Sequence, residues 1–167
     1  PAGLTATATV TVTVAGGTSG AALQPDQPLT IIIPHTGFSR SLTLTLTVPP
    51  GAVSRPTTLV YDDAPLLAAP PPDGLVEAGL RFSLTAYQDQ EPRAGFVFSR
   101  PMTVTIDFQP GELAGIGEES LALYDWTGSA WRRTGPEATP VEELRPRLTL
   151  TLTQLADFAV FGRPDRW

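Results

Sequence analysis

The sequence predicts an all-β protein, an antiparallel Greek-key β-sandwich with a long N-terminal strand on a flexible tether. Apolar and polar residues alternate with a period of two in many segments, a pattern typical of strands that bury one face. Glycine or proline turns separate most of these segments, at a spacing that favours a sandwich. Helix signals are confined to residues 115–120 and 139–144, each at most a turn or two long.

The first predicted strand is residues 4–14, in which apolar residues alternate strictly with threonine. Its apolar face consists of Leu4, Ala6, Ala8, Val10, Val12 and Val14. At ~3.3 Å per residue this strand would span roughly 35 Å, which is long for a globular protein. Residues 15–20 are small and rich in glycine, so they predict a flexible tether. We therefore divide the chain into residues 1–20, a candidate donor strand with its tether, and residues 21–167, a single β-sandwich domain.

The next two strands are predicted at residues 29–33, closed by Pro34, and at residues 42–48, closed by the turn Pro49-Pro50-Gly51. Gly51 is suited to the turn because it can adopt a positive φ. Residues 64–74 are rich in proline and predict an irregular loop within one domain. The remaining predicted strands are residues 57–61, 80–87, 96–98, 102–108, 120–126, 130–133, 148–153 and 158–161, with a hairpin turn at 126–131.

Composition excludes several classes of protein. The 167-residue chain carries a formal net charge of −6, and its 11 basic residues are scattered arginines, so we expect no nucleic-acid partner. No apolar run reaches the ~18 residues of a membrane-spanning helix, so we expect no membrane span. The chain has no cysteine, lysine or asparagine, which excludes disulfides, thiolate metal sites and isopeptide bonds. The lack of asparagine and cysteine fits chemical durability in heat or outside the cell, and high-GC codon bias accounts for it equally well.

We expect an extracellular or cell-surface location after removal of a signal peptide. The chain begins at Pro1 without an initiator methionine, which either processing or an artificial start would explain. The abundance of threonine, alanine, glycine and proline is common in secreted proteins.

Residues 44–53 read Leu-Thr-Leu-Thr-Val-Pro-Pro-Gly-Ala-Val, which resembles the strand and Pro-Gly-Ala turn of ZU-five domains, the β-rich modules of ankyrins, netrin receptors and bacterial surface proteins. Residues 98–107, 118–124, Trp131 and 158–162 resemble further segments of that family in the same order, so the resemblance covers roughly 38–162. It implies an immunoglobulin-like, ZU-five-like sandwich. Related modules that cleave themselves carry His-Phe-Ser, where this chain has Gln154-Leu155-Ala156, so we expect no self-cleavage.

We expect no catalytic residue, cofactor site or metal site. His35 is the only histidine, and without cysteine the usual zinc ligand sets cannot be built within one chain. The adjacent acids Asp62-Asp63, Glu118-Glu119 and Glu142-Glu143 lack a calcium-loop spacing, and neighbours on a strand point to opposite faces. Neither a nucleophile elbow nor a phosphate-binding loop occurs. The protein is therefore predicted not to be an enzyme.

Three functions follow from these observations. The first is a structural subunit that polymerises head to tail into a pilus-like surface filament by donating residues 4–14 to its neighbour. The second is a monomeric adhesion or spacer module of a larger surface protein. The third is a carbohydrate-binding domain, in which Tyr124, Trp126 and Trp131 would stack on a sugar while Asp125 and Arg132 hydrogen-bond to it; a cross-strand aromatic pair is the alternative reading of the same residues. The terminal Trp167 is a candidate anchor for a neighbouring subunit.

Overall fold

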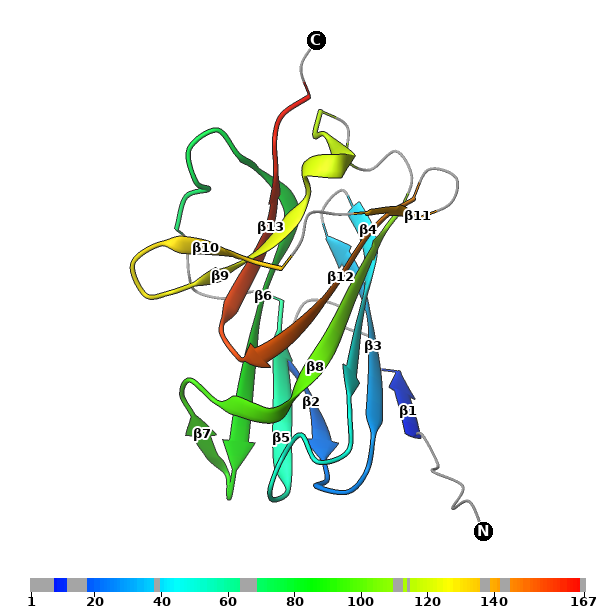
Figure 1. The fold of residues 1–167 in the computed structure, drawn as a ribbon, viewed down its shortest axis with the longest axis vertical. Helices are drawn as coiled ribbons and strands as arrows, with labels where there is room; N and C mark the ends of the chain where they lie inside the picture. The colour runs from blue at the N-terminus through cyan, green and yellow to red at the C-terminus, as the bar shows by residue number, and fades with distance from the viewer. Residues whose placement is uncertain are drawn as a thin grey trace.

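The protein is described from a computed structural model that covers residues 8–11, 18–37, 40–63, 69–109, 113, 115–135, 139–141 and 145–165. In this part of the chain two β-sheets pack face to face, which confirms the predicted all-β sandwich (Figure 1). One 3₁₀ turn, η1 (Glu118–Ser120), accompanies the strands, and none of the helical structure described is long and apolar enough to cross a membrane. The strands are β1 (Ala8–Thr11), β2 (Thr18–Leu23), β3 (Leu29–Gly37), β4 (Arg40–Val48), β5 (Thr57–Asp62), β6 (Val76–Gln88), β7 (Glu91–Arg93), β8 (Val97–Phe108), β9 (Ala122–Trp126), β10 (Trp131–Thr134), β11 (Thr139–Val141), β12 (Arg145–Gln154) and β13 (Asp157–Gly162).

The first sheet, called here the β4 sheet, has the order β1-β3-β4-β8-β12-β11. The second, the β6 sheet, has the order β10-β9-β13-β6-β5-β2, and β7 pairs with the far end of β6. The chain crosses repeatedly between the sheets, for example from β4 to β5, from β6 to β8 and from β12 to β13. Strand pairing is antiparallel except between β1 and β3, which run parallel.

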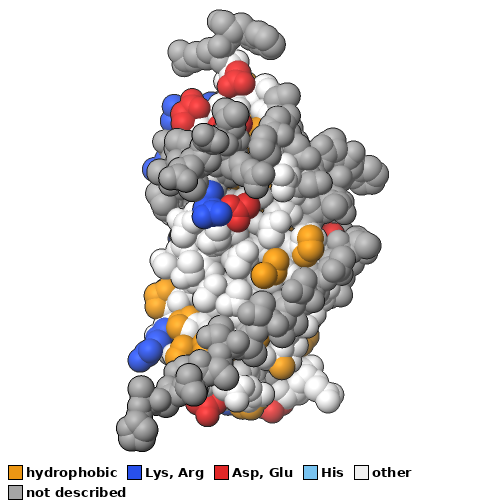
Figure 2. Space-filling model, turned by 90° about the vertical axis from the view of Figure 1, so that its right-hand side faces the viewer, with side chains coloured by type: hydrophobic (Ala, Val, Ile, Leu, Met, Phe, Trp, Pro, Cys, Tyr) orange, Lys and Arg blue, Asp and Glu red, His pale blue; other side chains and the backbone are white. Residues whose placement is uncertain are grey.

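The alternation in β4 produces one buried and one outward row, as the sequence predicts. The side chains of Leu42, Leu44, Leu46 and Val48 are at most 2% exposed and form part of the core. The intervening threonines face outward, and the register continues them across the sheet, with Thr47 opposite Thr103 and Thr103 opposite Thr151. In Figure 2, which looks onto the side where β1 and β3 lie, white covers most of the described surface, the colour of the backbone and of uncharged polar side chains.

The Pro49-Pro50-Gly51 turn also forms as predicted. Gly51 has a φ of 79°, and its N–H donates to the carbonyl of Pro25 at 2.7 Å. Ala52 is buried, and its carbonyl accepts a hydrogen bond from the N–H of Ser99 at 2.8 Å. The turn thus joins three separate segments of the chain at one end of the sandwich.

Four predicted boundaries were wrong. β3 continues through Pro34, because past Ile32 the described part of β3 is an edge where a missing N–H donor is tolerated. Residues 18–20, assigned to the tether, open β2, because their small side chains do not prevent the backbone from pairing with β5. Residues 139–141 form β11 rather than a helix, since they pair with β12. Residues 96–98 and 102–108 are not separate strands, because β8 runs without a break past Pro101.

Candidate functional site

The expected donor strand is only partly described. Ala8 and Val10 lie in β1, while Leu4, Ala6, Val12 and Val14 lie outside the described residues, as does Trp167. β1 is the edge strand of the β4 sheet and pairs in parallel with β3 of the same chain. Within the described residues, β3 from Ile33 to Gly37 pairs with β4 alone.

The β1 register matches the alternation of the N-terminal segment to that of β3. Ala8 is paired with Leu29 and Val10 with Ile31, two core residues that are 7% and 3% exposed. Thr9 is paired instead with Thr30, on the outward row. The register thus pairs Ala8 and Val10 with buried positions of β3, and Thr9 with an outward position.

A narrow apolar crevice opens between the two sheets beside β3, where β2 forms the edge of the β6 sheet. Its lining residues are Ser19, Gly20, Ala21, Ile31, Ile33, Leu46, Leu59 and Tyr61. The hydroxyl of Tyr61 is buried there without a hydrogen-bond partner among the described residues. Burial, followed by the charges of Asp63 and Asp62, raises the pKa of Tyr61, so this phenol stays neutral. The lining of the crevice is mostly apolar, and its two polar side chains, Ser19 and Tyr61, carry no charge.

The aromatic residues expected to form a sugar-binding platform pack against one another. Trp126 and Trp131 make an edge-to-face pair across the β9–β10 hairpin, with centroids 5.3 Å apart at 66°, which confirms the predicted hairpin. Tyr124 and Trp131 both contact the fully buried Phe161, each with centroids 5.2 Å apart. The guanidinium of Arg81 lies 5.5 Å from the Trp131 ring. Tyr124 and Trp131 therefore form an outer hydrophobic cluster on the β6 sheet rather than a flat open platform.

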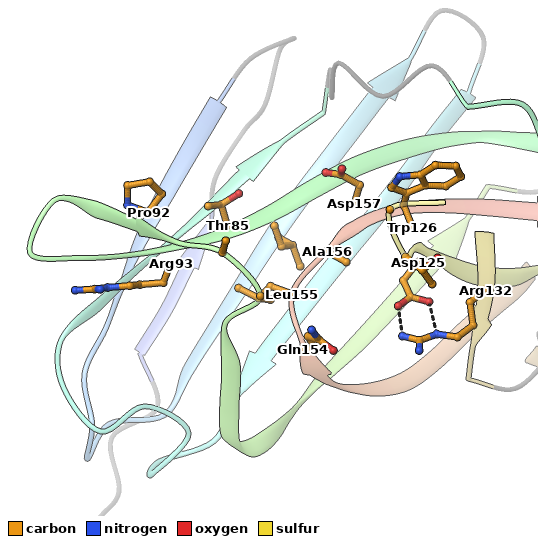
Figure 3. Close-up of a pocket in the computed structure, with 15 residues that line it drawn as sticks. Thr85, Pro92, Arg93, Asp125, Trp126, Arg132, Gln154, Leu155, Ala156 and Asp157 are labelled. Carbon is orange, nitrogen blue, oxygen red and sulfur yellow. Dashed lines mark hydrogen bonds and ion pairs between the residues drawn. The ribbon is translucent and has the colours of Figure 1, made fainter. Parts of the chain in front are cut away.

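Asp125 and Arg132 occupy the opposite face of the same hairpin, because neighbouring residues on a strand alternate. They are directly paired in the register, and Arg132 donates to both carboxylate oxygens of Asp125, with Nε to Oδ1 at 3.1 Å. The Asp125 side chain is 12% exposed and that of Arg132 is 64% exposed. This ion pair raises the pKa of Arg132, so the guanidinium is always charged. It lies in the wall of a cleft of about 650 Å³ (Figure 3).

The cleft, called here the hairpin cleft, lies between the β9–β10 hairpin and β7. Figure 3 places Trp126, Asp125 and Arg132 on one side, with the turn from β12 to β13 next to them. Gln154 ends β12, and Leu155 and Ala156 form that turn. Trp126, Asp125 and Arg132 could be singled out from the sequence, but no local pattern reveals that Gln154 and Asp157, on either side of the turn, line the same cleft.

Asp157 begins β13 and sits in register with Ser83 of β6, which is in turn opposite Asp62 of β5. Burial, and next the negative charge of Asp62, raise the pKa of Asp157. The folded state therefore holds this proton more tightly than the unfolded state. The free energy of unfolding therefore falls as the pH rises from the pKa that Asp157 has in the unfolded chain to its raised pKa in the folded protein.

Replacing Asp157 by asparagine is expected to raise the melting temperature at pH 7 and to leave it unchanged near pH 3, where both states are protonated. The gain should stay below about 1 kcal/mol because partial exposure screens the charge. Thermal unfolding at the two pH values measures the effect, with the exposed Asp26→Asn as the matched control. Equal shifts at both pH values would show that charge is not the cause.

The other acidic residues singled out in the sequence lie in separate elements where they are described. Asp62 ends β5 and Asp63 follows it, Glu118 and Glu119 lie in η1, and the side chain of His35 and residues 142–143 are outside the described part. Among the described residues, no group of three or more histidine, cysteine, aspartate or glutamate side chains could hold a metal ion. No model of a known protein family and no curated protein sequence matches the chain.

Proposed function

We propose that the protein is a non-enzymatic, extracellular structural subunit that polymerises head to tail by donating its N-terminal strand to the neighbouring subunit. The observation that carries the proposal is the parallel register of β1 on β3, which pairs Ala8 and Val10 of the apolar row with the buried Leu29 and Ile31. The apolar crevice beside β3 supports it, because an added strand at this edge would bring apolar side chains to that opening.

The same strand pairing can form within one chain or between two copies. Residues 12–17 connect β1 to β2 in the sequence, and six residues span at most about 20 Å when extended. Exchange of an identical element preserves every contact of the closed form, so protein concentration decides which form is populated. A head-to-tail contact that does not close on itself yields an open filament. Trp167 is proposed as an additional anchor at this contact.

The alternative is that β1 stays on its own β3, and the chain is then a monomeric adhesion or spacer module of a larger surface protein. The ZU-five resemblance fits this alternative as well as it fits a filament. Binding of surface glycans is a second candidate function, favoured by the hairpin cleft with its tryptophan and ion pair. It does not depend on whether β1 is donated.

Negative-stain electron microscopy and size-exclusion chromatography of the purified protein test polymerisation. We expect uniform filaments, and we expect Val10→Asp to abolish them because it places a charge in the row matched to Ile31. Thr9→Asp is the matched control, since Thr9 is in register with the outward Thr30. Deleting residues 1–17 should give a soluble monomer of lower stability.

Two outcomes would contradict the proposal. Discrete particles of 17.7 kDa at high concentration would identify a monomeric module. Filaments that survive both the deletion and Val10→Asp would show that assembly uses another surface.

A further inference from the structure

We infer that the hairpin cleft is a binding site for a neutral saccharide, with Trp126 as the apolar surface and Arg132, Gln154, Asp157 and Thr85 as hydrogen-bonding groups. This inference rests on the second candidate function above and names its site and ligand class. The cleft is distinct from β1 and the crevice beside β3, since the two regions share no lining residue.

The cleft arises where β6 changes partner. β13 pairs with β6 up to Ser83, and β7 takes over at Ala86. Between the two, the N–H of Leu84 donates to the carbonyl of Ala156 at 3.2 Å, and the N–H of Leu155 donates to the carbonyl of Phe96 at 3.1 Å. The opening in the sheet therefore has a floor whose backbone groups are paired. A depression of about 650 Å³ held by strands and a hydrogen-bonded turn is preformed and large enough for a small ligand.

Several polar groups in the cleft are available to a ligand. The side chains of Thr85, Gln154 and Asp157 have no hydrogen-bond partner among the described residues, and all three line the cleft. Arg132 uses Nε and one terminal nitrogen for Asp125, so the other terminal nitrogen keeps its N–H donors. These groups offer hydroxyl, amide, carboxylate and guanidinium chemistry within one concavity. That mixture of donors and acceptors suits the vicinal hydroxyls of a sugar ring.

Trp126 supplies the apolar part of the site. Its edge-to-face contact with Trp131 fixes the ring, and Trp131 is itself anchored on the buried Phe161. In Figure 3 the indole lies beside Asp157, on the face of β9 opposite to the Asp125–Arg132 pair. A sugar presents an apolar ring face and a rim of hydroxyls. The indole can take the ring face, with Asp157 and Thr85 on its side of the sheet, while Arg132 lines the cleft from the other side.

The charges of the cleft favour a neutral ligand. Asp125 compensates Arg132, and the guanidinium of Arg93 points away from this pair in Figure 3. Asp157 adds a carboxylate, and the whole chain carries a net charge of −6, so an anionic glycan or a phosphate is repelled. A cation has too few ligands, because Asp125 is already engaged in a bidentate pair.

The test is a panel of neutral gluco-, manno-, galacto- and chito-oligosaccharides, with heparin fragments as the anionic comparison, followed by calorimetric titration of the best probe. We expect a neutral oligosaccharide to bind, and both Arg132→Gln and Gln154→Ala to weaken it by about tenfold or more. Arg147→Gln is the matched control, because Arg147 also pairs with an aspartate, Asp107, but does not line the cleft. Thermal unfolding of each variant checks that the fold is retained, and Thr85→Val provides a nearly isosteric second variant.

The possible results distinguish an error in the proposed glycan-binding function from an error in assigning it to the hairpin cleft. If no glycan binds, both the glycan-binding function and this site are overturned. If a neutral glycan binds equally to wild type and cleft variants, glycan binding stands and the cleft is the wrong site. If the cleft variants weaken only heparin binding, the ligand class is wrong. Filament formation by the same variants, observed by electron microscopy, is expected to be unchanged in every case.

Discussion

Replacing Phe82 by alanine is expected to lower the free energy of unfolding by about 3–5 kcal/mol. Phe82 is fully buried at the centre of β6, and its ring stacks on Tyr61 on one side and on Phe158 on the other, with centroid distances of 5.7 and 5.3 Å. The three rings join β5, β6 and β13, so truncation removes contacts from both neighbouring strands and leaves a cavity that they cannot easily fill.

Denaturant-induced unfolding of the wild type and the variant measures this loss. Tyr87→Ala is the matched control, because Tyr87 lies on the same strand but on the outward face, and we expect it to cost much less. If Phe82→Ala does not fold, Phe82→Leu keeps the prediction measurable as a smaller loss. A loss below about 1 kcal/mol for Phe82→Ala would mean that the core repacks around the cavity.

The second large effect is expected at Gly162, the last residue of β13. A Cβ at this position would lie 2.5 Å from Cγ2 of Ile116, 3.1 Å from Cδ2 of Leu121 and 3.2 Å from Oγ of Ser120. Ile116 and Leu121 are buried, so they cannot move outward without losing packing. We therefore expect Gly162→Ala to destabilise the protein by about 1–3 kcal/mol through overpacking.

Ser120 also resists displacement by a Cβ at position 162, because its hydroxyl makes two hydrogen bonds. Its hydroxyl donates to the carbonyl of Gly117 at 2.6 Å and accepts from the N–H of Arg163 at 2.7 Å, which ties η1 to the end of β13. An added methyl group would strain both hydrogen bonds. The control is Gly20→Ala in β2, where the nearest atom would be 3.4 Å away, and there we expect little change or a slight stabilisation. Equal unfolding midpoints for the two variants would refute the packing argument.

Gly162 belongs to residues 158–162, one of the segments that resemble the ZU-five family, and this segment has a packing role in the structure. Residues 158–162 supply the fully buried Phe161 on one face of the sheet, the core residues Phe158 and Val160 on the other, and the close approach at Gly162. These are requirements of packing and do not by themselves identify a function. The functional proposals therefore rest on the β1 edge and the hairpin cleft instead.

The class of fold and most of the local structure follow from short-range patterns in the sequence. Alternation of leucine and threonine defines the buried row of β4, because a strand has a period of two whatever its partners are. The turn at Gly51 and the hairpin between Trp126 and Trp131 follow from short-range chemistry. From that hairpin register, the pairing of Asp125 with Arg132 could also have been deduced.

Which strands become neighbours, in contrast, depends on the packing of the whole fold. No local signal specifies that β1 runs parallel to β3, or that β6 passes from β13 to β7 and leaves the hairpin cleft between them. The same holds for the repulsion between Asp157 and Asp62, which share a row only because both strands align on Ser83. Local pattern sets which face of a strand is apolar, whereas partner and register depend on how all the apolar faces are buried together, a property of the whole chain.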